Sequence, residues 1–436
     1  MMPLRRAGRW VASRLSNNPP LAALLLHAGL LTAVYSALYC FGFVDRLPTN
    51  NSLLHWDVGL LLSVKEVGYA NPLLGYNAFF PLVPLVWRYA HLDLMQAALL
   101  NISVASMGLY LLARTFALTG RQLLLIMSAP LLMFVLVPYT EGFFFFFGAI
   151  LVSGLHRNRL GLTLVGLLGC CLTRSAGTLF VPAYLFAELL AWGSTSTGRR
   201  LLLNWVTGLL AIAASVGTVM LMQYREGGDA LAFYKVHSLW GHRFTAPANF
   251  LFSSAGVPMF WLDALALLVS LVAVVGCAVL GVQWLGQRWA GKPVTAPSKA
   301  VLFALGYTAG AGYFIVFYQN SDLVGMSRYL FATPFWGVLL AWAWQANWST
   351  PRVLAVLGVA LVAVGLMAGL PAQMVNFAPG EALWFFGLLG LYLASYWLVR
   401  PDRCRWYREI ATGLYFLNLF MLCFILNMFL NGVWVN

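Results

Sequence analysis

The chain has few charged residues for its length. Of its 436 residues only 9% are charged, whereas 61% are hydrophobic and 15% are aromatic. Soluble domains carry about 25% charged residues, so this chain could not cover a water-facing surface. The composition excludes a single soluble domain, a disordered chain and a fibrous repeat. It predicts an all-α polytopic membrane protein that forms a single integral membrane domain over residues 1–436.

The sequence also lacks the usual signs of a metal site. None of its six cysteines has metal-ligand spacing, and adjacent Cys170 and Cys171 lie within an apolar run. There is no Asp-x-Asp pair to hold a metal ion, so we predict neither a metal nor a cofactor. Basic residues are not interleaved with exposed aromatics, so we predict no nucleic-acid partner. The absence of an internal repeat counts against the common inverted-repeat transporters.

Long apolar runs predict about thirteen transmembrane helices. The first run follows Arg5, Arg6, Arg9 and Arg14 and is too long for a signal peptide, so we expect a retained helix. Two long extracytoplasmic loops are expected, at 45–78 and 223–261. The runs fall at 20–44, 79–113, 121–137, 142–155, 160–173, 176–192, 201–222, 262–285, 300–318, 328–346, 353–370, 383–399 and 410–431.

The charges predict an orientation for these spans. With a cytoplasmic N-terminus, eighteen of the 26 Lys and Arg residues fall in cytoplasmic gaps, as the positive-inside rule requires. Most acidic residues fall on the opposite side. Acids and bases gathered on one face indicate a polar site there, although solvated loop charges explain several of them. The outlying bases are Arg46, Lys65, Arg88, Arg174, Arg225, Lys235, Arg243 and Arg328.

The first long loop contains an amphipathic segment from Trp56 to Gly68. Trp56, Leu60, Val64 and Val67 are predicted to share one apolar stripe of an interfacial helix. Asp57 in this segment has two interpretations. It suits a general base that removes a proton from a sugar hydroxyl, or it caps the helix. The segment by itself leaves the two about even.

Five short motifs occur in order between about residues 55 and 335, each of them once. Together they resemble the PIG-V mannosyltransferases of the GT-C superfamily. The first lies in the first long loop and the last at the start of the tenth predicted span. The motifs are Trp56-Asp57 with Gly68-Tyr69 and Asn77-Ala78-Phe79-Phe80-Pro81-Leu82, then Pro138-Tyr139-Thr140-Glu141, Thr173-Arg174-Ser175-Ala176-Gly177, Gly228-Asp229 with His237 and Trp240, and Ser327-Arg328-Tyr329 with Pro334.

The resemblance implies a GT-C-like fold and an inverting transfer of mannose, or a related hexose, from a polyprenyl-phosphate sugar to a lipid-linked or glycolipid acceptor. Asp57 would be the general base. The departures from the family pattern are His55, Leu60 and Leu61, which leave the acceptor open. Arginine binds phosphate as a fork. Cations expected to hold the leaving phosphate are Arg328 and Arg174, with Lys235, His237 or Arg243.

Several further residues are expected to bind substrate. Glu141 either hydrogen-bonds sugar hydroxyls or pairs with Arg174 as a structural bond. Glu66 and Tyr69 line the loop helix, where a solvated face is the alternative for Glu66. His91 and His242 have no partner cluster in the sequence and are interpreted as satisfied polar residues. The remaining expected binding residues come from the motifs: Trp56, Asn77, Tyr139 and Tyr329.

A secondary transporter of an anionic or sugar-like solute is the competing interpretation, because carriers also place ionisable residues in their spans. A non-catalytic partner protein is a third. For an enzyme, the expected partners are a polyprenyl-phosphate sugar donor, a glycolipid acceptor and the membrane. We expect a bacterial plasma membrane with a periplasmic site, or else an endoplasmic reticulum membrane with a lumenal site.

Overall fold

The protein is helical in every regular element that its computed structural model describes. The described residues are 18–71, 75–175, 177–194, 197–245, 252–318, 322–368 and 379–435. Arg5, Arg6, Arg9 and Arg14, on which the predicted orientation partly depends, lie outside them. The all-α prediction is confirmed for the described part of the chain.

Six helices are long and apolar enough to cross a membrane, and a bent pair of helices makes a seventh candidate. This is compatible with a polytopic membrane protein, but it does not reach the predicted thirteen spans. The six are α2 (Pro19–Cys40), α5 (Leu94–Thr115), α11 (Gly198–Gly227), α13 (Val257–Trp289), α14 (Lys299–Tyr318) and α19 (Tyr407–Leu430).

The remaining helices are shorter, and most carry the other predicted apolar runs. They are α3 (Asp57–Val67), η1 (Gly75–Ala78), α4 (Leu82–Tyr89), α6 (Gly120–Met127), η2 (Pro130–Leu132), α7 (Met133–Leu136), α8 (Glu141–His156), α9 (Leu160–Thr173), α10 (Gly177–Leu190), α12 (Ala232–Lys235), η3 (Val236–Trp240), α15 (Met326–Phe331), α16 (Pro334–Gln345), α17 (Thr350–Ala368) and α18 (Pro379–Trp397).

Three predicted spans are broken by identifiable local signals. The run at 79–113 divides because Asp93 caps α5 in a reciprocal capping box with Gln96, which starts a new helix. Pro130 interrupts the run at 121–137, and Pro334 starts α16 within the run at 328–346. A proline in a helix interior removes a backbone hydrogen bond and clashes with the preceding turn. The apolar character of these runs could not locate the breaks.

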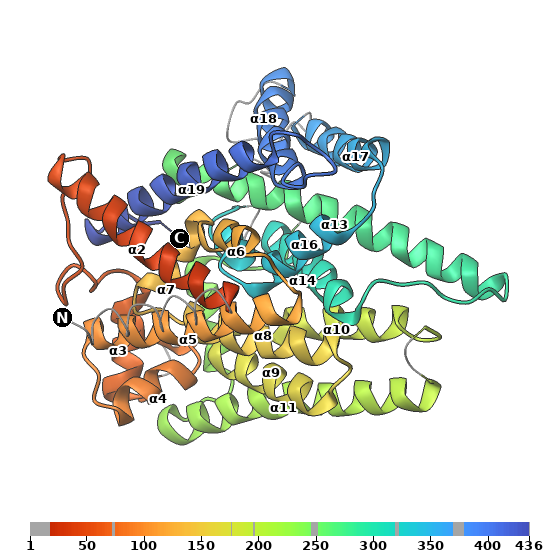
Figure 1. Cartoon of the computed structure of the whole chain (residues 1–436). Coiled ribbons are helices and arrows are strands. Elements are labelled where there is room, and N and C mark those ends of the chain that lie inside the picture. Colours follow the sequence, from red (N-terminus) through yellow and green to blue (C-terminus); the bar gives the residue numbers. More distant parts are fainter. Residues whose placement is uncertain are drawn as a thin grey trace, which may run out of the picture.

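The helices pack around α8 and α14 (Figure 1). Helix α8 lies between α5 and α9, and α14 packs against α10 and α13. Helices α2 and α19 pack against α6, while α17 and α18 pack against each other and against α13. Close approach of α8 and α9 depends on small residues. A Cβ at Gly166 would lie 2.5 Å from the backbone of Leu151.

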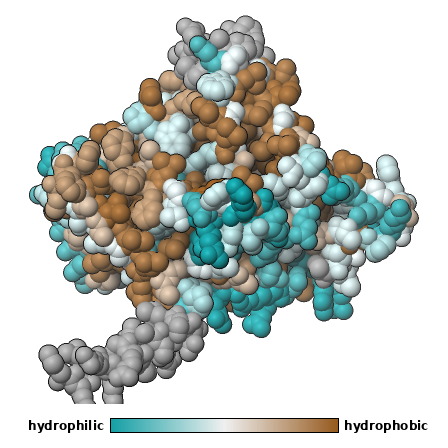
Figure 2. Space-filling view, turned by 45° about the horizontal axis from the view of Figure 1, so that its top comes forward, coloured by the Kyte–Doolittle hydropathy of each residue, from teal (hydrophilic) through white to brown (hydrophobic). Residues whose placement is uncertain are grey.

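Apolar residues cover much of the outer surface (Figure 2). On the face shown, hydrophobic residues spread over the upper part and the left, and hydrophilic residues gather in the lower middle. Leu202, Leu210 and Val362 are each more than 60% exposed. Exposed apolar area of this extent marks a surface that meets lipid or another protein.

The chain turns sharply between α7 and α8, and this turn positions the site described below. The segment Pro130–Leu136 and α8 meet at an angle of 109°. Asn101 of α5 satisfies the exposed carbonyls, since its Nδ2 donates to the oxygens of Phe134, Val135 and Val137 at 2.9–3.3 Å. The turn directs Thr140 and Glu141 to one end of the helix bundle.

Candidate active site

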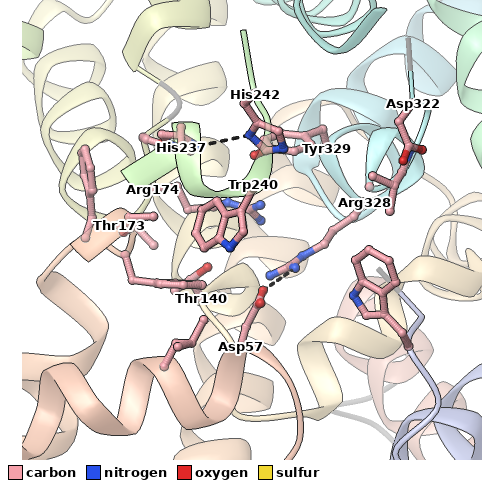
Figure 3. Close-up of a pocket in the computed structure, with 18 of the residues that line it drawn as sticks. Asp57, Thr140, Thr173, Arg174, His237, Trp240, His242, Asp322, Arg328 and Tyr329 are labelled. Atoms are coloured by element: carbon pink, nitrogen blue, oxygen red, sulfur yellow. Dashed lines mark hydrogen bonds and ion pairs between the residues drawn. The ribbon is translucent and has the colours of Figure 1, made fainter. Parts of the chain in front are cut away.

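A cavity of about 450 Å³ lies where the ends of several helices meet. Its walls come from α3, the turn before α8, the end of α9, the η3 region, the start of α15 and the segment after α19. Figure 3 shows Asp57 and Arg328 facing each other across its lower part, with Trp240 and the two histidines above them. The charged or titratable side chains that line the cavity are Asp57, Arg174, His237, His242, Asp322, Arg328 and Tyr329.

Helix α3 carries Asp57 at its N-terminal end, which faces the cavity. The side chain of Arg88 binds the C-terminal end of the same helix. Arg88 donates from Nη2 to the oxygen of Val64 at 2.9 Å and from Nε to the oxygen of Lys65. These bonds satisfy carbonyls that a helix C-terminus leaves open. Gly68 ends the helix with φ of 67°, in the left-handed region that favours glycine. The predicted helix in the first long loop is confirmed.

The predicted apolar stripe of α3 is observed only in part. Leu60 and Val64 pack on the same small cluster with Tyr69 and Tyr76, whereas Trp56 and Val67 are exposed. Trp56 precedes the helix with φ of 52° and ψ of −124°, so its side chain does not continue the helical pattern. The helix also buries Val58 and Leu61, which were not placed on the stripe.

The capping role considered for Asp57 is not observed. Trp56 holds the N-cap position, and no side chain caps the helix. Asp57 is the first helical residue, and its Oδ2 accepts a hydrogen bond from Nη1 of Arg328 at 2.7 Å. The Asp57 side chain is 23% exposed. It therefore lies on the cavity wall within reach of solvent or a ligand.

Asp57, Arg328, Glu141 and Arg174 form a continuous chain of ion pairs. Oε1 of Glu141 accepts from Nε of Arg328 and, at 2.5 Å, from Nη1 of Arg174. Glu141 is fully buried, whereas the side chains of Arg174 and Arg328 remain 13% and 6% exposed. The structural alternative for Glu141 is thus observed, and it extends to a second arginine. Glu141 lies behind the arginines rather than on the cavity wall.

Aromatic rings support both guanidinium groups. The Cζ atom of Arg328 lies 4.6 Å from the ring centre of Tyr139 and 4.7 Å from that of Phe134. The Cζ atom of Arg174 lies 5.0 Å from the ring centre of Tyr329. Cation–π contacts stabilise a partly desolvated guanidinium without neutralising it. They leave both arginines able to meet an anion in the cavity.

A buried carboxylate fixes the short helix that carries Arg328. Oδ1 of Asp263 on α13 accepts from the backbone N–H and the hydroxyl of Ser327, at 3.1 and 2.7 Å. Its Oδ2 accepts from the hydroxyl of Ser253 at 2.6 Å. Because Ser327 precedes Arg328, these bonds set the origin of the arginine side chain. Sequence reasoning placed Asp263 among the outer-side acids but gave it no role.

Two histidines form the opposite wall of the cavity. Nδ1 of His237 lies 3.3 Å from Nδ1 of His242, and the rings are stacked with Trp240 and Tyr318 beside them. The prediction that His242 has no partner cluster is wrong. Burial, with a smaller contribution from His242, lowers the pKa of His237 to about 4. Burial also lowers the pKa of His242, against an opposing effect of Asp322.

Other predicted residues do not reach the cavity lining. Lys235 is 61% exposed and pairs with Asp229 at 2.7 Å, so it is not brought to the arginines. Glu66 is exposed on α3, as its solvated-face alternative held. Arg243 is exposed, and its backbone N–H donates to the oxygen of Tyr318.

Two further predicted residues have structural contacts. The Tyr69 hydroxyl donates to the oxygen of Phe79, and its N–H donates to Glu226, both at 2.7 Å. The backbone oxygen of Asn77 accepts from Gln223 at 2.8 Å. These residues join the first long loop to the end of α11. Tyr69 and Asn77 therefore shape the loop and do not line the cavity.

Sequence reasoning gave no site role to several residues of the lining, among them Trp240, Asp322 and Trp434. Trp240 was considered only as part of a motif, and Asp322 only as an outer-side acid. Trp434 follows the last apolar run, where no motif was found. A tryptophan and a charged residue just beyond a span were available signals, because both are enriched where polar surface meets the membrane.

No group of three or more His, Cys, Asp or Glu side chains within the described ranges could hold a metal ion. The cavity instead offers two guanidinium groups, two imidazoles and two carboxylates. Such a set can bind an anion and accept a proton. No known protein family matches the sequence, and no curated protein is similar to it.

Proposed function

We propose that the protein is an inverting glycosyltransferase that moves a mannosyl or related hexosyl unit from a polyprenyl-phosphate sugar to a lipid-linked or glycolipid acceptor. One observation carries the proposal. A partly exposed carboxylate, Asp57, shares a cavity of about 450 Å³ with Arg174 and Arg328, which are nearly buried and share Glu141 as a counter-charge behind the cavity wall. This arrangement provides a base on one side and an anion site on the other.

The donor phosphate would bind Arg328 and Arg174. Both arginines share the single carboxylate Glu141, and Arg328 also meets Asp57. A phosphate could replace Asp57 as the second anionic partner of Arg328, because guanidinium groups bind phosphate through two parallel hydrogen bonds. His237 and His242 lie on the same cavity. Because their Nδ1 atoms pair with each other, the histidine that accepts in this pair keeps its Nε2–H and would donate it to a remaining oxygen.

Loss of the Arg328 contact would free Asp57 to act as a base. The acceptor hydroxyl oxygen would attack C1 of the donor sugar as its proton passes to Asp57. The bond between C1 and the phosphate oxygen would break, and its electron pair would leave with polyprenyl phosphate. The arginines would stabilise the charge on that leaving group. The attack from the opposite face inverts the configuration at C1.

The apolar surface supports a membrane location for both substrates. The donor and acceptor carry lipid chains, which would stay among the acyl chains while their polar heads enter the cavity. The family resemblance of the first-loop, Tyr-Thr-Glu and Ser-Arg-Tyr motifs adds to this interpretation. We further propose a bacterial plasma membrane and an extracytoplasmic cavity, with the endoplasmic reticulum lumen as the alternative.

The proposal is tested by reconstituting the purified protein in nanodiscs with radiolabelled polyprenyl-phosphate mannose and a panel of alkyl glycosides and lipid acceptors. Transfer by the wild type and its loss in Asp57→Asn are expected. Equal transfer by both would remove the base assignment. Sugar or anion flux in proteoliposomes without any transfer would instead favour the transporter.

A further inference from the structure

The segment after α19 contributes a tryptophan to the cavity. Gly432 reverses the chain just beyond the helix with φ of +76°, and a Cβ there would lie 3.2 Å from the His55 ring. The reversal leads Trp434 to the cavity wall. The Trp56 and Trp434 ring centres are 6.0 Å apart at an interplanar angle of 35°. The first long loop and the segment after α19 therefore meet beside the proposed base.

Hydrogen bonds fix this segment to the first long loop. Oδ1 of Asn427 accepts from the backbone N–H groups of Asp45 and Arg46, both at 3.2 Å. Nδ2 of Asn431 donates to Asp45 at 2.7 Å, and its Oδ1 accepts from Nε of Arg46 at 3.0 Å. Nε1 of Trp56 donates to the oxygen of Val433 at 3.2 Å. The two tryptophans are thus held in place by bonds that do not involve their ring faces.

Trp56 has an unfavourable backbone conformation. A positive φ is rare for a bulky residue, and such residues persist only when surrounding contacts enforce them. This conformation turns the Trp56 indole toward Val433 while Asp57 points to Arg328. Trp56 is still 46% exposed. Packing alone does not account for a strained, half-exposed tryptophan beside a carboxylate.

The cavity is divided by chemistry. The arginines and histidines that suit a phosphate come from η3, the following loop, α15 and the end of α9, whereas the indoles lie beside the start of α3. A flat aromatic face suits the apolar C–H face of a pyranose ring and leaves the sugar hydroxyls free for hydrogen bonds. A membrane-interface anchor would explain the exposed Trp56 indole, but not its contact with Trp434, which lines the cavity.

We propose that Trp56 and Trp434 form the platform that binds the pyranose ring of the acceptor and presents its hydroxyl to Asp57. This inference rests on the proposed function and names the class of acceptor: a glycoside rather than a simple lipid alcohol. Trp434 is then a specificity-determining residue that stacks on substrate. The donor's phosphate does not contact it.

The test compares two acceptors of equal chain length, octyl α-mannopyranoside and 1-octanol, with polyprenyl-phosphate mannose as donor. For Trp434→Ala we expect KM for the octyl mannoside to rise about tenfold, because one stacking contact is removed. The KM for the donor and the rate of donor hydrolysis in water should not change. Trp434→Phe should restore most of the affinity, and Trp289→Ala, an 85% exposed tryptophan on α13, serves as the matched control.

The outcomes separate this inference from the proposed function. No transfer to any acceptor by the wild type would overturn the proposed function. Transfer with an unchanged KM for the octyl mannoside in Trp434→Ala, or an equal preference of the wild type for both acceptors, would overturn the platform alone. An increase in the donor KM would assign Trp434 to the donor side and would also overturn it. Size-exclusion profiles of the variants exclude misfolding as the cause.

Discussion

The two carboxylates that contact Arg328 differ in burial. The same chemical change is therefore expected to affect stability at one of them and the transfer rate at the other. Glu141→Gln and Asp57→Asn each remove one negative charge without changing shape. Glu141 is fully buried between Arg174 and Arg328, whereas Asp57 is 23% exposed and forms an ion pair with Arg328. The first change should therefore reduce the free energy of unfolding, and the second should reduce the rate of transfer.

The expected magnitudes follow from the ion pairs. Removing Glu141 leaves two nearly buried guanidinium groups without their shared counter-charge, and breaking such a buried pair costs about 3–5 kcal/mol. In Asp57→Asn, Arg328 keeps Glu141, so the loss is about 1 kcal/mol. The same variant should lower the transfer rate by about 10²- to 10⁴-fold, as expected for loss of a general base.

The assay is reversible unfolding in mixed micelles, combined with transfer rates in nanodiscs. Glu66→Gln is the matched control, because Glu66 is an exposed carboxylate and its loss should change stability by no more than about 0.5 kcal/mol. Equal destabilisation by Glu141→Gln and Asp57→Asn would refute the reasoning. So would a stable Glu141→Gln variant that has lost transfer, since this would make Glu141 a group that acts on substrate.

Three further predictions concern phosphate binding, pH and packing. Arg328→Lys should weaken equilibrium binding of polyprenyl-phosphate mannose about tenfold by removing the fork geometry, while Lys235→Ala, in an exposed ion pair, should not. The pKa of His237 is lowered from 6.5 to about 4 in the folded protein. Between these pH values the His237 imidazole is therefore protonated in the unfolded chain but neutral in the folded one. The unfolding midpoint should therefore fall as pH drops from 6.5 toward 4, less steeply in His237→Gln, and equal slopes would contradict this. Gly166→Ala should destabilise by about 1–3 kcal/mol because its Cβ would meet the α8 backbone, whereas Gly161→Ala on the same helix faces open space and should not, as unfolding curves would show.

The local sequence was enough to predict some of the site. The start of α3 near Asp57 and its end at Gly68 follow from an amphipathic pattern and a glycine. Arg174 and Arg328 were expected in the site because charge near a span is costly without a partner, and both line the cavity. The Glu141–Arg174 pair was one of two alternatives, and the structure contains it. Local pattern and charge cost act within a few residues, so they are visible in the sequence.

Other features depend on contacts between distant segments. Arg328 contacts Asp57, which lies 271 positions away in the chain, and Glu141, which lies 187 positions away. The division of long apolar runs depends on where a helix breaks, and the number of apolar residues in a run does not reveal that position. The pairing of His237 with His242 was not predicted, because it depends on how the loop after η3 folds back.

The sequence by itself determined the class of the protein, because too few charges and many apolar runs leave helices as the regular element. It also determined which residues could carry chemistry. Only the tertiary structure decided which of them share a cavity, and it brought Trp434 beside Trp56 while leaving Lys235 with Asp229. The physical reason is that ion pairs and aromatic contacts act over a few ångströms in space, and the distance along the chain does not limit them.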